Sequence, residues 1–511
     1  MPWTSVETYT NRDDTINKTT QDNKEEIMRK GFDNDKYLAM QSEHIRERIQ
    51  QFDNKLYLEF GGKLYDDYHA SRVLPGFEPD SKLRMLMQLA DQVEIVIVIS
   101  AEDIEKNKVR GDLGITYDSD LLRLKGIFES KNLYVGSVCI THYAGQYSAQ
   151  MFQNRLEKMG VKVYRHYLIP GYPNNIPLIV SEDGYGHNEY IETTKPLVVV
   201  TAPGPGSGKM ATCLSQLYHE HKRGVRAGYA KYETFPIWNL PLSHPVNLAY
   251  EAATADLNDV NMIDPYHLEA YGKTTVNYNR DVEIFPVLKA MFMEIYGECP
   301  YKSPTDMGVN MAGNCIVDDE ACREASGQEI IRRYYQTLVN IARGKSKEEE
   351  AYKIELLMNT AGVSVKDRKV VPAALKRAEE TGYTAVAMEL DDGTIITGKT
   401  GELLGACAAL LIKALKHLAG IGEDVLLITP NVIRPIQRLK VDYLGSKNPR
   451  LHMEEVLIAL SASTETNPLA DLALKQLPRL RGSQVHSSRM LSAADEKTFQ
   501  KLGIMMTSEP K

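Results

Sequence analysis

The chain has 511 residues, of which 43% are hydrophobic and 25% are charged, and its formal net charge at pH 7 is -8. This length exceeds what one hydrophobic core usually supports, so we expect roughly two to four domains. The acidic balance argues against a dedicated nucleic-acid-binding protein, because such proteins neutralise phosphates with an excess of Lys and Arg. A small anion site needs only local donors and stays compatible with the charge.

Three features bear on the compartment. The longest apolar runs, Val93 to Ile99 and Pro196 to Thr201, have the length of strands, well below the roughly 18 residues of a membrane span. Residues 1–27 are polar and lack the apolar stretch of a secretory signal, so they predict a disordered tail. The six cysteines are scattered, which is typical of free thiols in a reducing compartment. We therefore expect a cytoplasmic protein with no membrane partner.

The first half of the chain alternates strand-like and helical patterns. In chain order they predict a strand at 56–60, a helix at 81–92, a strand at 93–100, a helix at 118–131, a strand at 133–141, a helix at 149–159 and strands at 161–169 and 197–201. Continuous apolar strands separated by helices indicate a parallel sheet covered on both faces. We therefore predict a doubly wound α/β fold, in which ligands bind at the carboxyl ends of the strands.

The second half is less regular. Residues 233–313 are rich in Pro, Asn, Tyr and Asp and predict long loops with a helix at 282–296, followed by exposed helices at 319–343 and 347–359. The sequence Asp391-Asp392-Gly393 between two short apolar runs indicates a hairpin of 385–390 and 394–397. Residues 403–418 are apolar almost all round and predict a buried helix. We expect strands at 425–429 and 456–461 and helices at 468–477 and 495–502.

These patterns predict a division of the chain. After the tail we expect a phosphate-loop-like α/β domain at 28–232, an insertion or lid region with a bridging helix at 233–343, a connecting helix at 344–364 and a smaller α+β domain at 365–511.

A glycine-rich loop follows the apolar strand that ends at Thr201. It contains Gly204, Gly206, Ser207, Gly208 and Lys209, and an amphipathic helix is predicted from Lys209 onward. Glycines let successive backbone N–H groups point toward an anion, and the helix N-terminus adds positive potential. This pattern predicts a phosphate site, with Lys209 supplying a mobile charge. The structural alternative is a tight strand-to-helix turn with a solvent-facing lysine.

The loop departs from the nucleoside-triphosphate pattern G-x-x-x-x-G-K-[ST]. The first glycine of that pattern falls on Pro203 and its Ser or Thr falls on Met210, while Thr212 and Ser207 stand nearby. Because a thioether is a poor ligand for Mg²⁺, the usual metal-anchoring hydroxyl is missing. Two alternatives stay open: the ligand binds without Mg²⁺, or carboxylates elsewhere, such as Glu182, Asp183 or Asp264, hold the metal.

Candidate catalytic residues follow the loop in sequence. Asp264 and His267 are three residues apart, which places them on one face of a helix, and Arg280 has the guanidinium group that pairs with substrate anions. Together with Lys209 they suit phosphoryl or acyl-phosphate chemistry. The alternative for each of them is capping or internal hydrogen bonding. No cysteine or histidine spacing indicates a metal site.

Three stretches resemble a known family. They are KPLVVVTAPGPGSGKMATCLSQ at 195–216, FPIWNLPLSHPVNLAYEAATADLNDVNMIDPYHL at 235–268 and VNYNRDVEIFP at 276–286. In these stretches, and over almost all of 31–510, the chain resembles the bacterial domain-of-unknown-function family 1846, the UPF0371 group. The resemblance implies a cytosolic multidomain α/β protein and no particular reaction.

The sequence thus supports two functional hypotheses. The first is an enzyme, an ATP-dependent kinase or ligase acting on a small metabolite, with ATP or another phosphorylated ligand at the loop. The second is a non-catalytic sensor that binds a phosphorylated metabolite there, and a third reading places the function away from the loop. As partners we expect a phosphorylated small molecule and further copies of the same chain.

Overall fold

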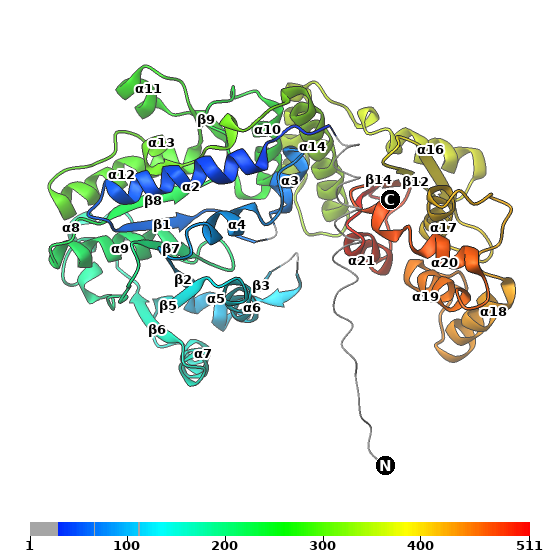
Figure 1. The fold of residues 1–511 in the computed structure, drawn as a ribbon, viewed down its shortest axis with the longest axis horizontal. Coiled ribbons are helices and arrows are strands. Elements are labelled where there is room, and N and C mark those ends of the chain that lie inside the picture. The colour runs from blue at the N-terminus through cyan, green and yellow to red at the C-terminus, as the bar shows by residue number, and fades with distance from the viewer. Residues whose placement is uncertain (1–28, 66, 111–112) are drawn as a thin grey trace, which may run out of the picture. The chain divides into compact units, whose positions relative to one another are not determined.

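The computed structural model describes residues 29–65, 67–110 and 113–511, so the predicted tail at 1–27 lies outside the described residues. The chain separates into two compact units (Figure 1). The N-terminal unit comprises residues 30–251 and 258–323, and the C-terminal unit comprises residues 252–257 and 324–511. Within the described ranges, no helix combines the length and the apolar composition that crossing a membrane requires.

The N-terminal unit is built on a parallel sheet of seven strands. Their spatial order is β11 (Gly308–Val309), β8 (Gly228–Tyr232), β1 (Leu56–Phe60), β7 (Leu197–Thr201), β2 (Val93–Ser100), β5 (Tyr134–Tyr143) and β6 (Lys162–Tyr167). Every bonded pair in this sheet is parallel. All residues of β1, β2 and β7 are buried, as expected for strands covered on both faces. The predicted parallel α/β sheet is confirmed.

The connections place helices on both faces of this sheet. The path from β1 through β2 and β5 to β6 runs toward one edge, through α4 (Ser81–Met87), α5 (Ala101–Glu105), α6 (Tyr117–Ser130) and α7 (Tyr147–Lys158). The path from β7 through β8 to β11 runs toward the other edge, through α9 (Lys209–Lys222) and α12 (Asn279–Tyr296). Because such crossovers are right-handed, the two sets of helices cover opposite faces.

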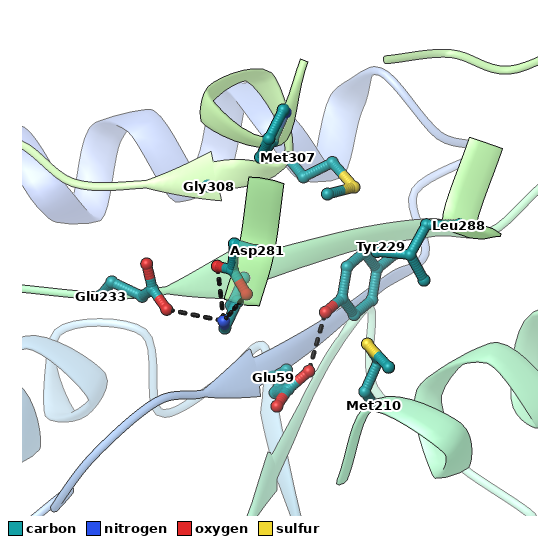
Figure 2. A pocket seen from close by; sticks show the side chains of 10 residues that line it. Glu59, Met210, Tyr229, Glu233, Asp281, Leu288, Met307 and Gly308 are labelled. Carbon is teal, nitrogen blue, oxygen red and sulfur yellow. Dashed lines mark hydrogen bonds and ion pairs between the residues drawn. The ribbon is translucent and has the colours of Figure 1, made fainter. Parts of the chain in front are cut away.

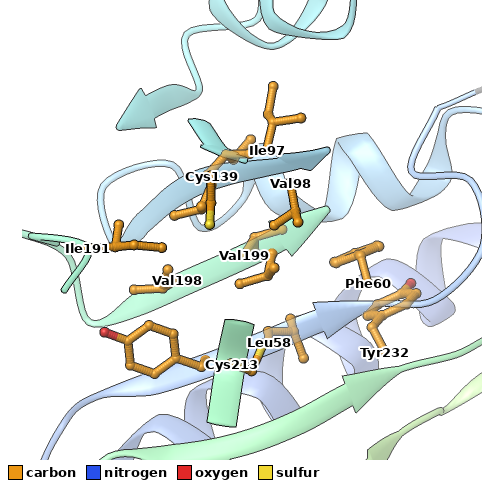
Figure 3. Packing of buried hydrophobic residues seen from close by; sticks show 14 of the residues in the cluster. Leu58, Phe60, Ile97, Val98, Cys139, Ile191, Val198, Val199, Cys213 and Tyr232 are labelled. Carbon is orange, nitrogen blue, oxygen red and sulfur yellow. The ribbon is translucent and has the colours of Figure 1, made fainter. Parts of the chain in front are cut away.

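The core of this unit lies between the central strands and α9. Figure 3 shows Leu58 of β1, Val199 of β7 and Cys213 of α9 among the buried side chains, and all three are fully buried. The remaining elements of the unit are α2 (Asn34–Gln50), α3 (Tyr68–Val73), α8 (Ile176–Ile179), α10 (Pro245–Ala253), α11 (Pro265–Tyr271), α13 (Pro304–Met307) and the two-stranded pairs β3 (Val109–Arg110) with β4 (Ile115–Thr116) and β9 (Asn261–Ile263) with β10 (Val276–Tyr278).

The C-terminal unit has a smaller, mixed sheet. Its strand order is β13 (Ile395–Lys399), β12 (Ala385–Glu389), β14 (Gln484–Ser487) and β15 (Met505–Ser508), of which only β14 and β15 are parallel. The predicted hairpin is therefore present as β12 and β13. The helices are α14 (Asp319–Ala342), α15 (Glu348–Ala361), α16 (Val370–Thr381), α17 (Ala406–Leu418), α18 (Pro430–Arg438), α19 (Met453–Ser463), α20 (Pro468–Leu474) and α21 (Ala493–Lys501). Helix α17 is the buried helix predicted at 403–418.

Two predicted strands are wrong. Residues 456–461 lie inside helix α19, where the buried residues Val456, Ala459, Leu460 and Ser463 recur at helical spacing. A short apolar run does not distinguish a strand from a buried helix by itself. Residues 425–429 form no strand and lead into α18, which begins at Pro430 after Thr429 as its N-cap.

A histidine–aspartate pair in the C-terminal unit makes stability depend on pH. His452 Nδ1 lies 3.1 Å from Asp495 Oδ2, and this hydrogen bond raises the pKa of His452 above its ordinary value. A raised folded-state pKa gives stabilisation that is complete below the unfolded-state pKa and is lost as pH rises through the folded value. As the pH is raised from about 6 to about 8, we expect the thermal midpoint to decrease. In His452→Gln the decrease should be smaller. Parallel pH profiles for the two proteins would refute this coupling.

Candidate functional site

The glycine loop joins β7 to α9 at the carboxyl edge of the large sheet. Gly206 and Gly208 have φ values of 73° and 85°, in the left-handed region that glycine adopts without strain. The backbone oxygen of Ser207 accepts a hydrogen bond from Thr141 Oγ1 at 2.6 Å. Because Thr141 lies near the end of β5, this bond fixes the loop against the sheet. The predicted strand–loop–helix is therefore present as a structural unit.

Close packing explains why the loop begins with glycine. A Cβ atom on Gly204 would lie 2.3 Å from Tyr117 Oη, far inside normal contact distance. Tyr117 is the first residue of α6 and is buried. The ring of Tyr117 therefore occupies the space that a side chain at position 204 would need.

The start of α9 leaves its backbone donors open. Its N-cap is Gly208, which has no side chain to accept from the first turn, whereas Asp33 caps α2 and Asp264 caps α11. In the part of the chain that the structure describes, the backbone N–H groups of residues 206–211 have no protein acceptor. Open N–H groups at the positive end of a helix dipole form an environment that suits an anion.

At the same place, Lys209 is a cation with no direct counter-ion among the described residues. Its side chain is partly buried, and the described residues provide no hydrogen-bond or ion-pair partner for its ammonium group. Burial lowers the pKa of Lys209, and the positive charge of Lys231 acts in the same direction, while Glu59 opposes both. A desolvated ammonium group beside open N–H groups gains most from a bound anion.

A cluster of charged residues that the sequence reading missed lies next to this loop. Glu59 of β1 and Lys231 of β8 are direct partners across the parallel pair. Alternation along β8 places Tyr229 and Lys231 on one face, and Glu233 follows directly after the strand. The signal was present in the sequence, because an ionisable residue within a buried strand is costly unless it is paired. Glu59 and Lys231 are both ionisable residues within such strands.

Lys231 is the centre of the cluster, because it contacts both Asp281 and Glu233, which are labelled in Figure 2. Its Nζ lies 2.5 and 2.6 Å from the two carboxylate oxygens of Asp281 on α12 and 2.8 Å from Glu233 Oε1. Tyr278 Oη donates to Glu233 Oε1 at 2.6 Å, and Tyr229 Oη donates to Glu59 Oε2 at 2.7 Å. Two carboxylates are thus each held by a tyrosine on the same side of the sheet.

Burial changes the protonation of this cluster. Burial raises the pKa of Glu233, and the negative charge of Asp281 adds to the effect, although Lys231 opposes it. Burial alone would lower the pKa of Lys231, but Asp281, Glu233 and Glu59 outweigh it and raise this pKa well above its ordinary value. Lys231 therefore stays charged, and Glu233 takes up a proton at a higher pH than an ordinary glutamate does.

A cavity of about 40 Å³ lies between the cluster and the first turn of α9. Its walls include Glu59, Lys231, Glu233 and Asp281, together with Met210 of α9. Figure 2 shows Met210 facing the same space as the Tyr229–Glu59 pair. Because Met210 directly follows Lys209, the end of the loop and the charged cluster meet at one cavity.

The structure places Asp264 and His267 in hydrogen bonds within the fold. Asp264 is the N-cap of α11: its Oδ1 accepts from the backbone N–H of His267 at 3.0 Å, and its Oδ2 accepts from Thr305 Oγ1 at 2.6 Å. His267 Nδ1 lies 2.9 Å from Ser303 Oγ. These contacts agree with the alternative in which the two residues serve in helix capping and internal hydrogen bonding. Catalytic roles for both residues remain predictions.

Arg280 and Thr212 have structural contacts as well. Arg280 pairs with Asp259 through two contacts, of 2.6 Å from Nε and 2.7 Å from Nη2. Thr212 is fully buried on α9, with its side chain next to the thiol of Cys139. Glu182 pairs with Lys222. Across the residues that the structure describes, no group of three or more His, Cys, Asp or Glu side chains is arranged to hold a metal ion.

Comparison with known proteins identifies the family. Residues 30–362 match the family model "Domain of unknown function DUF1846, N-terminal", and residues 366–511 match the corresponding C-terminal model. The chain is 59% identical to "UPF0371 protein str1377" of Streptococcus thermophilus over 484 residues, which is 95% of this chain and 98% of that relative. It is 58% identical to "UPF0371 protein cu0538" of Corynebacterium urealyticum over 482 residues, 94% of this chain and 97% of that relative. The chain therefore belongs to the DUF1846 family.

Proposed function

We propose that this protein binds a nucleotide or another phosphorylated small molecule at the carboxyl edge of its parallel sheet. The backbone N–H groups of residues 206–211 and the ammonium group of Lys209 hold the phosphate, while Gly204, Gly206 and Gly208 give the loop its shape. The observation that carries the proposal is the convergence of a desolvated, unpaired lysine with an uncapped helix N-terminus.

A ligand screen tests this proposal. We expect at least one compound among nucleotides, sugar phosphates and inorganic pyrophosphate to raise the thermal midpoint of the full-length protein. A ligand present at 100 times its Kd stabilises the folded state by about 2.7 kcal/mol, which is readily measured. If no phosphorylated compound shifts the midpoint at millimolar concentration, the proposed binding function is wrong.

Two versions of this function differ in chemistry. An ATP-dependent kinase or ligase needs a group that accepts a proton from the attacking substrate, and the buried carboxyl group of Glu233 next to the loop favours this version. A non-catalytic sensor needs only the phosphate site, and Met210 in place of the usual hydroxyl favours that version. Release of ADP or AMP from ATP in the presence of candidate metabolites distinguishes the two.

The role of Mg²⁺ gives a specific prediction. Met210 presents a soft thioether where a phosphate loop normally has an oxygen ligand for Mg²⁺. Lys209 and the loop N–H groups can neutralise the phosphate without a metal. We therefore expect the affinity for the phosphorylated ligand to change less than about tenfold, or roughly 1.4 kcal/mol, between EDTA and excess Mg²⁺. A much larger loss in EDTA, measured by calorimetry, would show that a metal is integral to the site.

A further inference from the structure

The cavity beside the glycine loop has the chemistry of a site for a neutral hydrogen-bond donor. Glu59 and Glu233 both line it and are both buried. On each carboxylate one oxygen accepts from a tyrosine. In the described part of the chain, the other oxygen, Oε1 of Glu59 or Oε2 of Glu233, has no donor. A carboxylate oxygen that lacks a donor in the wall of a cavity can accept a hydrogen bond from a ligand or from water.

The charge balance favours a hydroxyl group over an ammonium group. Lys231 already contacts the carboxylates of Asp281 and Glu233, and tyrosines donate to Glu59 and Glu233. Bringing an additional cation into this enclosed space would cost its hydration and would place it close to the ammonium group of Lys231. A hydroxyl group can donate to a carboxylate oxygen and carries no charge.

The position of the cavity links this donor to the phosphate site. Met210 lines the cavity, and it directly follows Lys209 in the first turn of α9. The ammonium group of Lys209 also experiences the charges of Glu59 and Lys231. One small molecule can therefore reach the loop with its phosphate and the cavity with a group a few bonds away.

We propose that the cavity is a hydroxyl subsite, and that the ligand of this protein is a phosphate ester of a polyhydroxylated compound, such as a sugar or polyol phosphate. A ligand hydroxyl donates to the open oxygen of Glu233 or Glu59. This inference rests on the proposed phosphate site and specifies the part of the ligand next to the phosphate.

Matched probes test the subsite separately from the phosphate site. Calorimetry compares glycerol 3-phosphate with propyl phosphate, which has the same carbon chain and phosphate but no hydroxyl groups. For the wild-type protein we expect glycerol 3-phosphate to bind at least about tenfold more tightly, as befits hydrogen bonds to a carboxylate. Equal affinities for the two probes would overturn the hydroxyl subsite and leave the phosphate site standing. Failure of both probes, while another phosphorylated compound of the screen binds, would overturn this inference alone. Failure of every phosphorylated compound would overturn the phosphate site, and this inference with it.

Two variants locate the effect. In Glu233→Gln and in Glu59→Gln we expect the preference for glycerol 3-phosphate to shrink, while the affinity for propyl phosphate stays within about twofold of wild type. Glu298→Gln is the control, because Glu298 is exposed and lies outside the cavity. Glu59 lies on β1 and Glu233 directly follows β8, so a folding defect in one variant leaves the other informative. An unchanged preference in both variants would overturn the assignment.

Discussion

Replacing Lys231 by Met is expected to lower the free energy of unfolding by about 3–5 kcal/mol, because the change leaves buried carboxylates without their cation. Lys231 contacts Asp281 and Glu233, and its side chain is only 15% exposed. The methionine fills a similar volume but donates no hydrogen bond. Part of the loss is recovered as Glu233 takes up a proton, so the destabilisation should be larger at high pH than at low pH.

Urea unfolding with matched variants checks this expectation. The double variant Lys231→Met/Asp281→Leu removes the strongest partner together with the cation and should be more stable than Lys231→Met alone. Lys162→Met is the control, since Lys162 lies on the edge strand β6 and is exposed. A loss for Lys231→Met within about 0.5 kcal/mol, the range of ordinary surface substitutions, would show that the cluster contributes little to stability.

Replacing Lys209 by Ala is expected to weaken binding of the phosphorylated ligand roughly 10- to 100-fold, the effect of losing a charged hydrogen bond to phosphate. The same change should not lower the thermal midpoint of the unliganded protein. The wild-type ammonium group is desolvated, and its described surroundings offer it no partner that the substitution would disrupt. Loss of affinity without loss of stability would therefore show that Lys209 contributes to ligand binding and not to folding.

A second lysine serves as the control for this experiment. Lys158→Ala removes an exposed lysine at the end of α7 and should leave the affinity unchanged. Equal affinity of Lys209→Ala and wild type would remove Lys209 from the phosphate site. A fall in the midpoint of Lys209→Ala as large as the loss of binding energy would instead indicate a structural role for the lysine.

Hydrophobic patterning predicts the framework of the large sheet well. The strands at 56–60, 93–100 and 197–201 appear at the predicted bounds because their continuous apolar runs need cover on both faces. The glycine loop and the start of α9 at Lys209 are also where the sequence predicts them. Local pattern is sufficient here, because strand, turn and helix signals follow one another without ambiguity.

The charged cluster could not be predicted in the same way, because its members come together only through the sheet order. Glu59 and Lys231 are far apart in the chain and become neighbours because β8 pairs with β1. Asp281 reaches Lys231 from the first turn of α12. For Asp264, the following Pro265 was a local signal for a helix N-cap. Asp264 lies just before α11 rather than within it, and the three-residue spacing to His267 does not distinguish a cap from a catalytic group.

Hydrogen exchange of the wild-type protein tests the central claim most directly. The measurement compares amide exchange with and without the phosphorylated compound that gives the largest thermal shift. If the loop N–H groups hold the phosphate, the compound should slow exchange in peptides that cover residues 204–212, because the described structure offers the N–H groups of residues 206–211 no acceptor. Slower exchange confined to other regions, with residues 204–212 unchanged at saturation, would contradict the account and place the ligand elsewhere.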